Sequence, residues 1–65
     1  MRIDLNGAEV TTQAQTLAAL LDELGFDAAS VATALDGQFV ARAARATTSV
    51  SDGAKIEVLS PMQGG

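Results

Sequence analysis

The residues that invite a chemical interpretation are the last six, Ser60-Pro61-Met62-Gln63-Gly64-Gly65, which follow directly on the apolar stretch KIEVL. Glycine loses the most conformational freedom on ordering and packs no side chain, so a Gly-Gly end contributes little to a fold. Pro61 restricts itself and Ser60 to extended backbone, which projects the end away from the body. We therefore predict a domain over residues 1–60 and a flexible reactive tail over residues 61–65. A loose end without a function is the alternative.

The chemistry available to such a tail is that of its terminal carboxylate. Gly64 and Gly65 leave no side chains around this group, so it can pass through a narrow channel into the active site of a partner. The carboxylate is ionised at neutral pH, because its unperturbed pKa is about 3.3–3.7. A carboxylate is a poor electrophile, and its activation as an acyl-adenylate requires ATP, Mg²⁺ and electrophilic stabilisation. We expect a partner to supply all three.

Other side chains of the sequence offer no catalytic arrangement. Asp22 and Glu23 are adjacent on a predicted helix and do not converge on one site. Asp36 and Asp52 each precede a glycine, which is typical of turns. The sequence contains no Cys and no His, which excludes a disulfide, a zinc site, a cysteine nucleophile and a Ser–His relay. We therefore predict no intrinsic catalytic residue, no metal site and no bound cofactor.

Two arginines are the remaining candidates for a binding site. Arg42 and Arg45 are three residues apart, and they would form an anion or partner site if their segment is helical. Two solvated surface arginines are the alternative. We retain Arg42 as a candidate partner-binding residue.

Composition narrows the class of protein further. The 65 residues carry a formal net charge of −4, with no basic run and two aromatic residues, Phe26 and Phe39. This composition does not fit a nucleic-acid-binding protein and favours basic partners. No apolar run approaches the roughly 20 residues that span a bilayer. The first residues, MRIDLNG, alternate in polarity and lack the apolar region of a signal peptide, so we expect a cytoplasmic protein.

Hydrophobic periodicity predicts the elements that hold the tail. Ile3–Leu5 and Ala8–Thr12 alternate around Asn6-Gly7, the dipeptide typical of a type I′ hairpin turn. The stretch TLAALLDELG has leucines at helical spacing, a capping Thr16 and a terminating Gly25. The remaining elements are short strands within residues 31–40, an irregular crossover anchored by Val50, and a closing strand, KIEVLS, with Ile56 and Val58 inward.

The order of these elements predicts an α+β fold. A hairpin cannot bury its apolar face alone, and the leucine stripe of the helix is the obvious cover for it. The closing strand, if it pairs beside the first strand, runs parallel to it. We expect a ubiquitin-like β-grasp roll, with a mixed sheet of four to five strands and one main helix packed across it.

Alternation along the closing strand also predicts a partner surface. With Ile56 and Val58 inward, Leu59 faces outward, and Met62 follows shortly after it. We expect Leu59 and Met62 to form an apolar contact site that leads to Gly65. A stray surface leucine is the alternative.

Taken in order, these segments resemble the sulfur-carrier protein of thiamine biosynthesis, the ThiS-like family of ubiquitin-like β-grasp proteins. The resemblance rests on LNG at 5–7, TLAALLDELG at 16–25, ALDGQFVAR at 34–42, VSDGAKIEV at 50–58, and Gly64-Gly65. The family often has a proline where this chain has Ala41, and an aromatic residue where it has Arg45.

The resemblance implies a protein co-substrate and not an enzyme. An E1-like adenylyltransferase would adenylate Gly65 with ATP. Sulfur, drawn from cysteine through the persulfide of a cysteine desulfurase, would then replace the AMP and leave a C-terminal thiocarboxylate. Thiazole synthase would take this sulfur into the thiazole ring of thiamine.

Several alternatives stay open at this point. The small subunit of molybdopterin synthase shares the fold, the Gly-Gly end and the thiocarboxylate, although it is usually longer; a related carrier would serve cysteine or a secondary metabolite. A non-reactive interaction module, or a ubiquitin-like modifier conjugated to lysines, belongs to a different class. An interaction module would tolerate the loss of Gly65, and a carrier would not.

Overall fold

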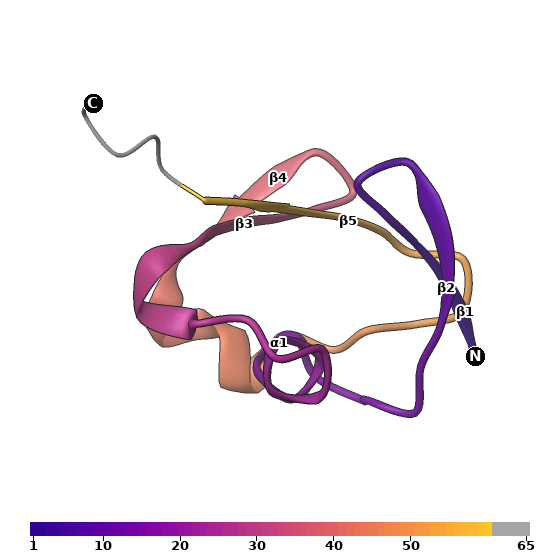
Figure 1. Ribbon diagram of the computed structural model, residues 1–65, viewed down its shortest axis with the longest axis horizontal. Coiled ribbons are helices and arrows are strands. Elements are labelled where there is room, and N and C mark those ends of the chain that lie inside the picture. The colour runs from indigo at the N-terminus through magenta and orange to yellow at the C-terminus, as the bar shows by residue number, and fades with distance from the viewer. Residues whose placement is uncertain (61–65) are drawn as a thin grey trace.

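A mixed five-stranded sheet packs against one main helix in the computed structural model, which describes residues 1–60 (Figure 1). The strands lie in the order β2-β1-β5-β3-β4. Their bounds are β1 Arg2–Leu5, β2 Ala8–Thr11, β3 Ala32–Leu35, β4 Gln38–Val40 and β5 Lys55–Leu59. The helix α1 spans Leu17–Glu23, and two 3₁₀ helices, η1 and η2, span Ala28–Ser30 and Arg42–Thr47. The predicted β-grasp fold is confirmed.

Two hairpins form the outer parts of the sheet. β1 and β2 pair antiparallel around Asn6 and Gly7, whose φ values of 51° and 86° suit a type I′ turn. β3 and β4 pair in the same way around Asp36 and Gly37, with φ values of 50° and 84°. Each turn places a residue that tolerates the left-handed region directly before a glycine. The two Asx-Gly dipeptides therefore set the registers of both hairpins.

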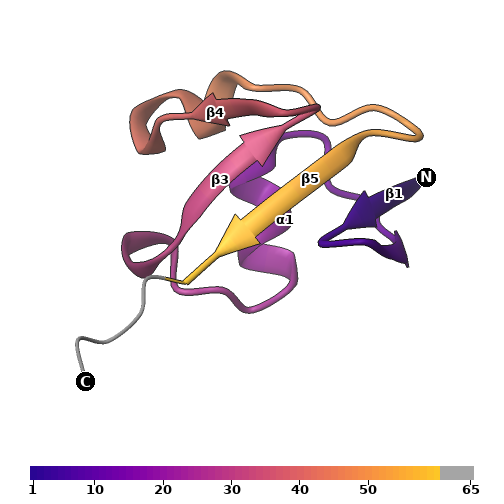
Figure 2. The same cartoon turned by 90° about the horizontal axis from the view of Figure 1, so that it is seen from above.

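The closing strand β5 lies at the centre of the sheet and joins the hairpins. It runs parallel to β1 and antiparallel to β3. The predicted parallel pairing of the first and last strands is thus confirmed. β5 ends at the opposite side of the molecule from the N-terminus (Figures 1 and 2).

The helix α1 covers one face of the sheet with its leucine stripe. Leu17, Leu20 and Leu21 are all at most 1% exposed. The Thr16 hydroxyl accepts a hydrogen bond from the Ala19 N–H and caps the helix. Gly25, at φ 79°, ends it. From the sheet, the buried core receives Ile3, Val40, Ile56 and Val58.

The crossover after β4 is more regular than the sequence suggested. Arg42–Thr47 form η2, which packs against α1 on the helix side of the sheet. The chain then pairs with the segment before α1, where the Leu17 N–H donates to the Thr48 carbonyl and the Val50 N–H donates to the Gln15 carbonyl, both at 2.9 Å. Val50 is 6% exposed, as predicted for the core anchor of this segment.

The other face of the sheet is open. Within residues 1–60 both α1 and the 3₁₀ helices lie behind the sheet when it is viewed from this side (Figure 2). Across those residues, no helix is long and apolar enough to cross a membrane. The open face, which we call the outer face, carries the outward side chains of all five strands.

Candidate functional site

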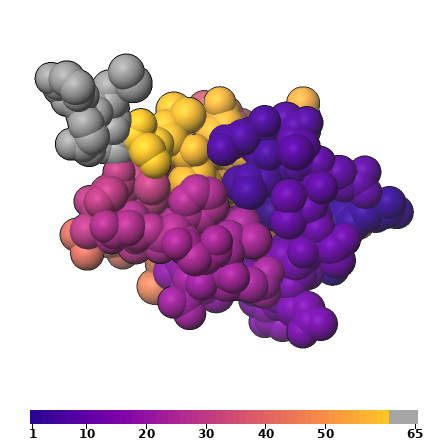
Figure 3. Space-filling view, viewed as in Figure 1, coloured from indigo at the N-terminus to yellow at the C-terminus, as the bar shows by residue number. Residues whose placement is uncertain are grey.

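The root of the predicted tail is fixed at the end of β5. The last pair in the ladder between β3 and β5 joins Ala32 and Leu59, and Ser60 follows it on the surface. The end of β5 reaches the surface between the N-terminal hairpin and the segment before β3 (Figure 3). The predicted reactive Gly65, and Gly64 and Met62 with it, lie outside the described residues. The sheet therefore determines where the tail leaves the domain.

A side-chain clamp strengthens this root. The Asn6 Nδ2 group donates to the Val58 carbonyl at 3.0 Å, and the Val58 N–H donates to Asn6 Oδ1 at 2.9 Å. The two bonds continue the pairing of β1 with β5 by one more step, after the Asn6 N–H has bonded the Ile56 carbonyl at 2.9 Å. The Asn6-Gly7 turn accounts for Asn6 through its backbone conformation alone. The sequence did not indicate that the Asn6 side chain would also bond the backbone of β5. Asn6 thus holds β5 one residue before Leu59.

Leu59 faces outward as the alternation predicts. It is 60% exposed, whereas Ile56 and Val58 are 1% and 5% exposed. A second large apolar side chain, Phe39, is 74% exposed on the same outer face. Both line one shallow pocket, whose other lining residues are Ala32, Thr33, Ala34 and Glu57.

Phe39 was not among the predicted site residues. The signal for it was present, because Val40 is the inward residue of a very short strand and its neighbour must then face outward. Ala34 lies between Glu57 and Phe39 in the register of the sheet, and Ala32 lies beside Leu59. Two small residues on β3 therefore leave the apolar side chains of β4 and β5 accessible.

The two arginines have different environments. For Arg45 the sequence offered two interpretations, an anion or partner site shared with Arg42 and a solvated surface residue, and neither is correct. Arg42 is exposed at the start of η2, but Arg45 is only 4% exposed. Arg45 is therefore not a solvated surface residue, and its buried guanidinium does not form an anion site with Arg42. The segment is helical, as the predicted anion site required. The 3₁₀ helix nevertheless turns Arg45 toward the protein interior.

The Arg45 guanidinium connects η2 to the start of β3. Its Nε donates to Thr33 Oγ1 at 3.0 Å, and its two terminal nitrogens donate to the Ala28 and Val31 carbonyls at 2.8 and 2.6 Å. The Thr33 hydroxyl in turn donates to the Val40 carbonyl at 2.9 Å. Arg45 therefore satisfies two partly buried carbonyl groups on the segment that leads into β3, the strand that pairs with the end of β5.

We expect Arg45→Met to lower the free energy of unfolding by about 1.5–3 kcal/mol, the range for hydrogen bonds made by a charged group. Methionine retains apolar packing but leaves the Ala28 and Val31 carbonyls without their donor. Urea unfolding measures the change, and Arg42→Met is the matched control, with an expected effect within about 0.5 kcal/mol. Equal effects of the two substitutions would contradict the assigned role of Arg45.

Arg42 acts electrostatically within the fold. The carboxylate of Asp27, which caps η1, accepts hydrogen bonds from the Ser30 hydroxyl and the Ala29 N–H. The Ser30 bond, followed by the Ala29 bond, lowers the pKa of Asp27 below its ordinary value, and the positive charge of Arg42 contributes in the same direction. No structural observation assigns Arg42 to a partner, so its binding role stays a prediction.

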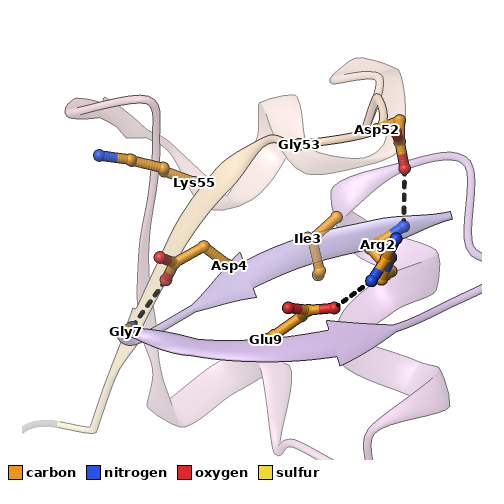
Figure 4. A pocket seen from close by; sticks show the side chains of 8 residues that line it. All are labelled: Arg2, Ile3, Asp4, Gly7, Glu9, Asp52, Gly53 and Lys55. Carbon is orange, nitrogen blue, oxygen red and sulfur yellow. Dashed lines mark hydrogen bonds and ion pairs between the residues drawn. The ribbon is translucent and has the colours of Figure 1, made fainter.

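A charged pocket lies at the other end of the outer face (Figure 4). Arg2 pairs with Glu9 at 2.8 Å, and the Arg2 N–H donates to the Asp52 carboxylate at 2.8 Å. The Asp4 carboxylate accepts a hydrogen bond from the Gly7 N–H at 2.7 Å. The bond to Asp52 ties the first hairpin to the turn before β5, and the other two contacts lie within the hairpin. Residues 1–60 contain no group of three or more carboxylates arranged to hold a metal ion.

The fold and the tail root can now be compared with known proteins. The model of the ThiS family matches residues 3–65. The chain belongs to the ThiS family. The resemblance drawn from the sequence motifs is therefore confirmed, and family membership supports a sulfur-carrier role.

Solved structures agree with this assignment. The crystal structure of the thiamine biosynthesis protein ThiS from Geobacter metallireducens is 32% identical to this ThiS-family chain, with a TM-score of 0.87 and 100% coverage of both chains. The NMR solution structure of a thiamine biosynthesis protein from the same organism is also 32% identical. Its TM-score is 0.82, and the match covers 100% of this chain and 88% of the other. No curated protein matches the sequence.

Proposed function

We propose that this chain is a sulfur carrier whose Gly65 carboxylate is converted to a thiocarboxylate that donates sulfur for thiazole formation in thiamine biosynthesis. The observation that supports it most is the position of the tail root. β5 pairs with β3 up to Leu59, and on its other side it pairs with β1 up to Ile56 and is bonded by the Asn6 side chain at Val58. The sequence continues from there to Gly64-Gly65. The domain thus places the root of a chain end that carries no side chain at Gly64 and Gly65 directly after the exposed Leu59.

The proposed activation is carried out by an E1-like adenylyltransferase. A Gly65 carboxylate oxygen attacks the α-phosphorus of ATP, pyrophosphate leaves, and an acyl-adenylate forms. In this proposal the adenylyltransferase binds the ATP and Mg²⁺. The carrier contributes position and shape, which bring its carboxylate to the nucleotide.

Sulfur enters in the next steps. The terminal sulfur of a persulfide, formed on a cysteine desulfurase or another donor, attacks the acyl carbon and AMP leaves. A thiol then cleaves the resulting acyl disulfide, which leaves the thiocarboxylate on Gly65 and a disulfide on the donor side. Thiazole synthase accepts the sulfur and returns the carboxylate. The chain is consumed and regenerated as a co-substrate, and it is not itself an enzyme.

Adenylation can be tested without the later steps. The adenylyltransferase, the chain and ATP are expected to exchange labelled pyrophosphate into ATP, because acyl-adenylate formation is reversible. The exchange requires both proteins. Its absence with an adenylyltransferase that activates another ThiS-family carrier would contradict the proposed function.

The proposed docking role of Leu59 predicts a loss of affinity without a loss of stability. Burying a leucine side chain is worth about 1.5–3 kcal/mol, which corresponds to roughly 10- to 150-fold in a dissociation constant. We expect Leu59→Glu to weaken adenylyltransferase binding by at least about tenfold and to leave the melting curve unchanged, because Leu59 is mostly exposed. Titration calorimetry measures the affinity.

Thr11→Glu is the matched control for this substitution. Thr11 is exposed on β2, pairs with Arg2, and lies at the far edge of the sheet. The added charge is the same, but we expect affinity within about twofold of the unaltered chain. A Leu59→Glu chain that folds and is adenylated at the original rate would rule out the docking role.

A further inference from the structure

Glu57 is a carboxylate set in the apolar part of the outer face. It occupies the outward position of β5 between Ile56 and Val58, both of which are buried. Across the sheet it pairs with Ala34, which in turn pairs with Phe39. Leu59 is the next outward residue on the same strand. A charged group thus shares one shallow pocket with two large exposed apolar side chains.

The other charged side chains of the outer face lie on the first hairpin and at the start of β5. Arg2 and Glu9 form an ion pair at 2.8 Å, the only one within residues 1–60. Lys55 lies opposite Asp4 in the parallel ladder of β1 and β5 but forms no ion pair with it, and it is the outward residue before Glu57 on β5. Glu57 faces an alanine in its ladder pair, and its side chain forms no hydrogen bond or ion pair within residues 1–60. Glu57 is therefore a carboxylate without an ion-pair partner within residues 1–60, set beside the two large exposed apolar side chains of this face.

A partner that covers Phe39 and Leu59 must also cover Glu57. Removing an ionised carboxylate from water is costly unless an opposite charge and hydrogen bonds replace the water. A partner with a flat apolar surface would bury Glu57 without a counter-charge and would bind weakly. A partner with a cation opposite Glu57 would bind more tightly. Ala34, the ladder partner of Glu57, carries only a methyl group, so no large side chain stands opposite the carboxylate on β3.

We propose that Glu57 selects the activating partner: the adenylyltransferase presents an arginine or lysine, surrounded by apolar residues, that pairs with Glu57 while Phe39 and Leu59 become buried. This inference rests on the proposed function for the identity of the partner. Continuity supports it, because Glu57 is two residues before Leu59 and the tail begins just after Leu59. The net charge of −4 agrees with a cationic complement.

The test compares charge removal and charge reversal at Glu57. We expect Glu57→Gln to weaken binding to the adenylyltransferase by about tenfold, and Glu57→Lys by about 100-fold or more, as for other desolvated charge pairs. In the pyrophosphate exchange assay, Glu57→Lys should raise KM for the carrier and keep kcat within about twofold, because the reacting carboxylate is elsewhere. The melting curves should be unchanged, since Glu57 makes no side-chain contact that the fold requires.

The matched control is Asp22→Lys. Asp22 is exposed on α1, on the opposite side of the sheet, and its replacement changes the net charge by the same amount. We expect its affinity to stay within about twofold. Equal losses for Asp22→Lys and Glu57→Lys would show that only the total charge matters, and they would overturn the inference.

The outcomes separate this inference from the proposed function. If the unaltered chain is adenylated and Glu57→Lys is adenylated with the same KM, the role of Glu57 is wrong and the carrier function stands. If the adenylyltransferase does not activate the unaltered chain, both fail. Restored binding of the Glu57→Lys carrier by an arginine-to-glutamate substitution in the adenylyltransferase would identify the paired residue.

Discussion

Deletion of Gly65 is expected to abolish adenylation and thiocarboxylate formation while the unfolding curve stays unchanged. In the proposed mechanism the reacting carbon is the Gly65 carboxyl carbon. Removing one residue withdraws the carboxylate by about 3.3–3.6 Å, the length of one extended residue. Misplacement of a reacting group by even about 1 Å can reduce a rate about 100-fold. Pyrophosphate exchange and intact-mass measurement report the loss.

A chain with one added glycine after Gly65 is the matched control for length. This chain still ends in a glycine carboxylate, but the carboxylate is one residue farther along the chain from β5 than in the unaltered protein. We therefore expect this variant to be inactive as well. Replacing Gly64 with a bulky residue should have a similar effect, because the proposed channel admits no side chain. Full activity of the chain that lacks Gly65 would contradict the carrier mechanism and would favour an interaction module.

Leu21→Ala is expected to have the largest effect on folding. Leu21 is 1% exposed in the core between α1 and the sheet, and truncation of a buried leucine costs about 2–5 kcal/mol. A domain of this size has a total stability on the order of 5 kcal/mol. We therefore expect the variant to be largely or wholly unfolded at 37 °C.

Urea or thermal unfolding measures the effect of Leu21→Ala. Leu59→Ala provides the control, because it removes the same atoms from a side chain that is 60% exposed. A Leu21→Ala melting curve that matches the parent, or equal losses for the two variants, would contradict the assignment of the core.

Local patterns in the sequence predicted the elements and most of the core. Asx-Gly dipeptides determine the conformation of both hairpin turns through residues adjacent in the chain, and the leucine spacing determines the buried side of α1. Alternation in β5 placed Val58 inward and Leu59 outward, because strand periodicity acts over two residues. Each of these features depends on near neighbours, and this is why a single sequence was sufficient.

Side-chain hydrogen bonds to distant partners were not predicted. Asn6 pairs with the backbone of Val58, which is 52 positions away in the sequence. Arg45 donates to carbonyls 14 and 17 positions before it. Neither residue type indicates these partners, because a buried arginine is rare and an Asn before Gly already has a sufficient explanation as a turn.

The structure shows what Arg45 does at a position where this chain departs from the pattern of the resemblance. The resemblance implies an aromatic residue at the position of Arg45. Arg45 instead has a guanidinium that bonds two carbonyl groups and the Thr33 hydroxyl. Because Thr33 is next to Ala32, this network supports the strand that pairs with Leu59. The departure therefore affects how the tail root is held.

The most direct test of the carrier mechanism is the intact mass of the chain after incubation with its adenylyltransferase, ATP, a persulfide donor and a thiol. The account predicts the mass gain of one oxygen-to-sulfur exchange, together with alkylation of the new thioacid at Gly65. The sequence has no Cys, so no thiol side chain competes with the thioacid for the alkylating reagent. An isopeptide bond to a lysine of another protein, or an unchanged mass with a competent adenylyltransferase, would contradict the account.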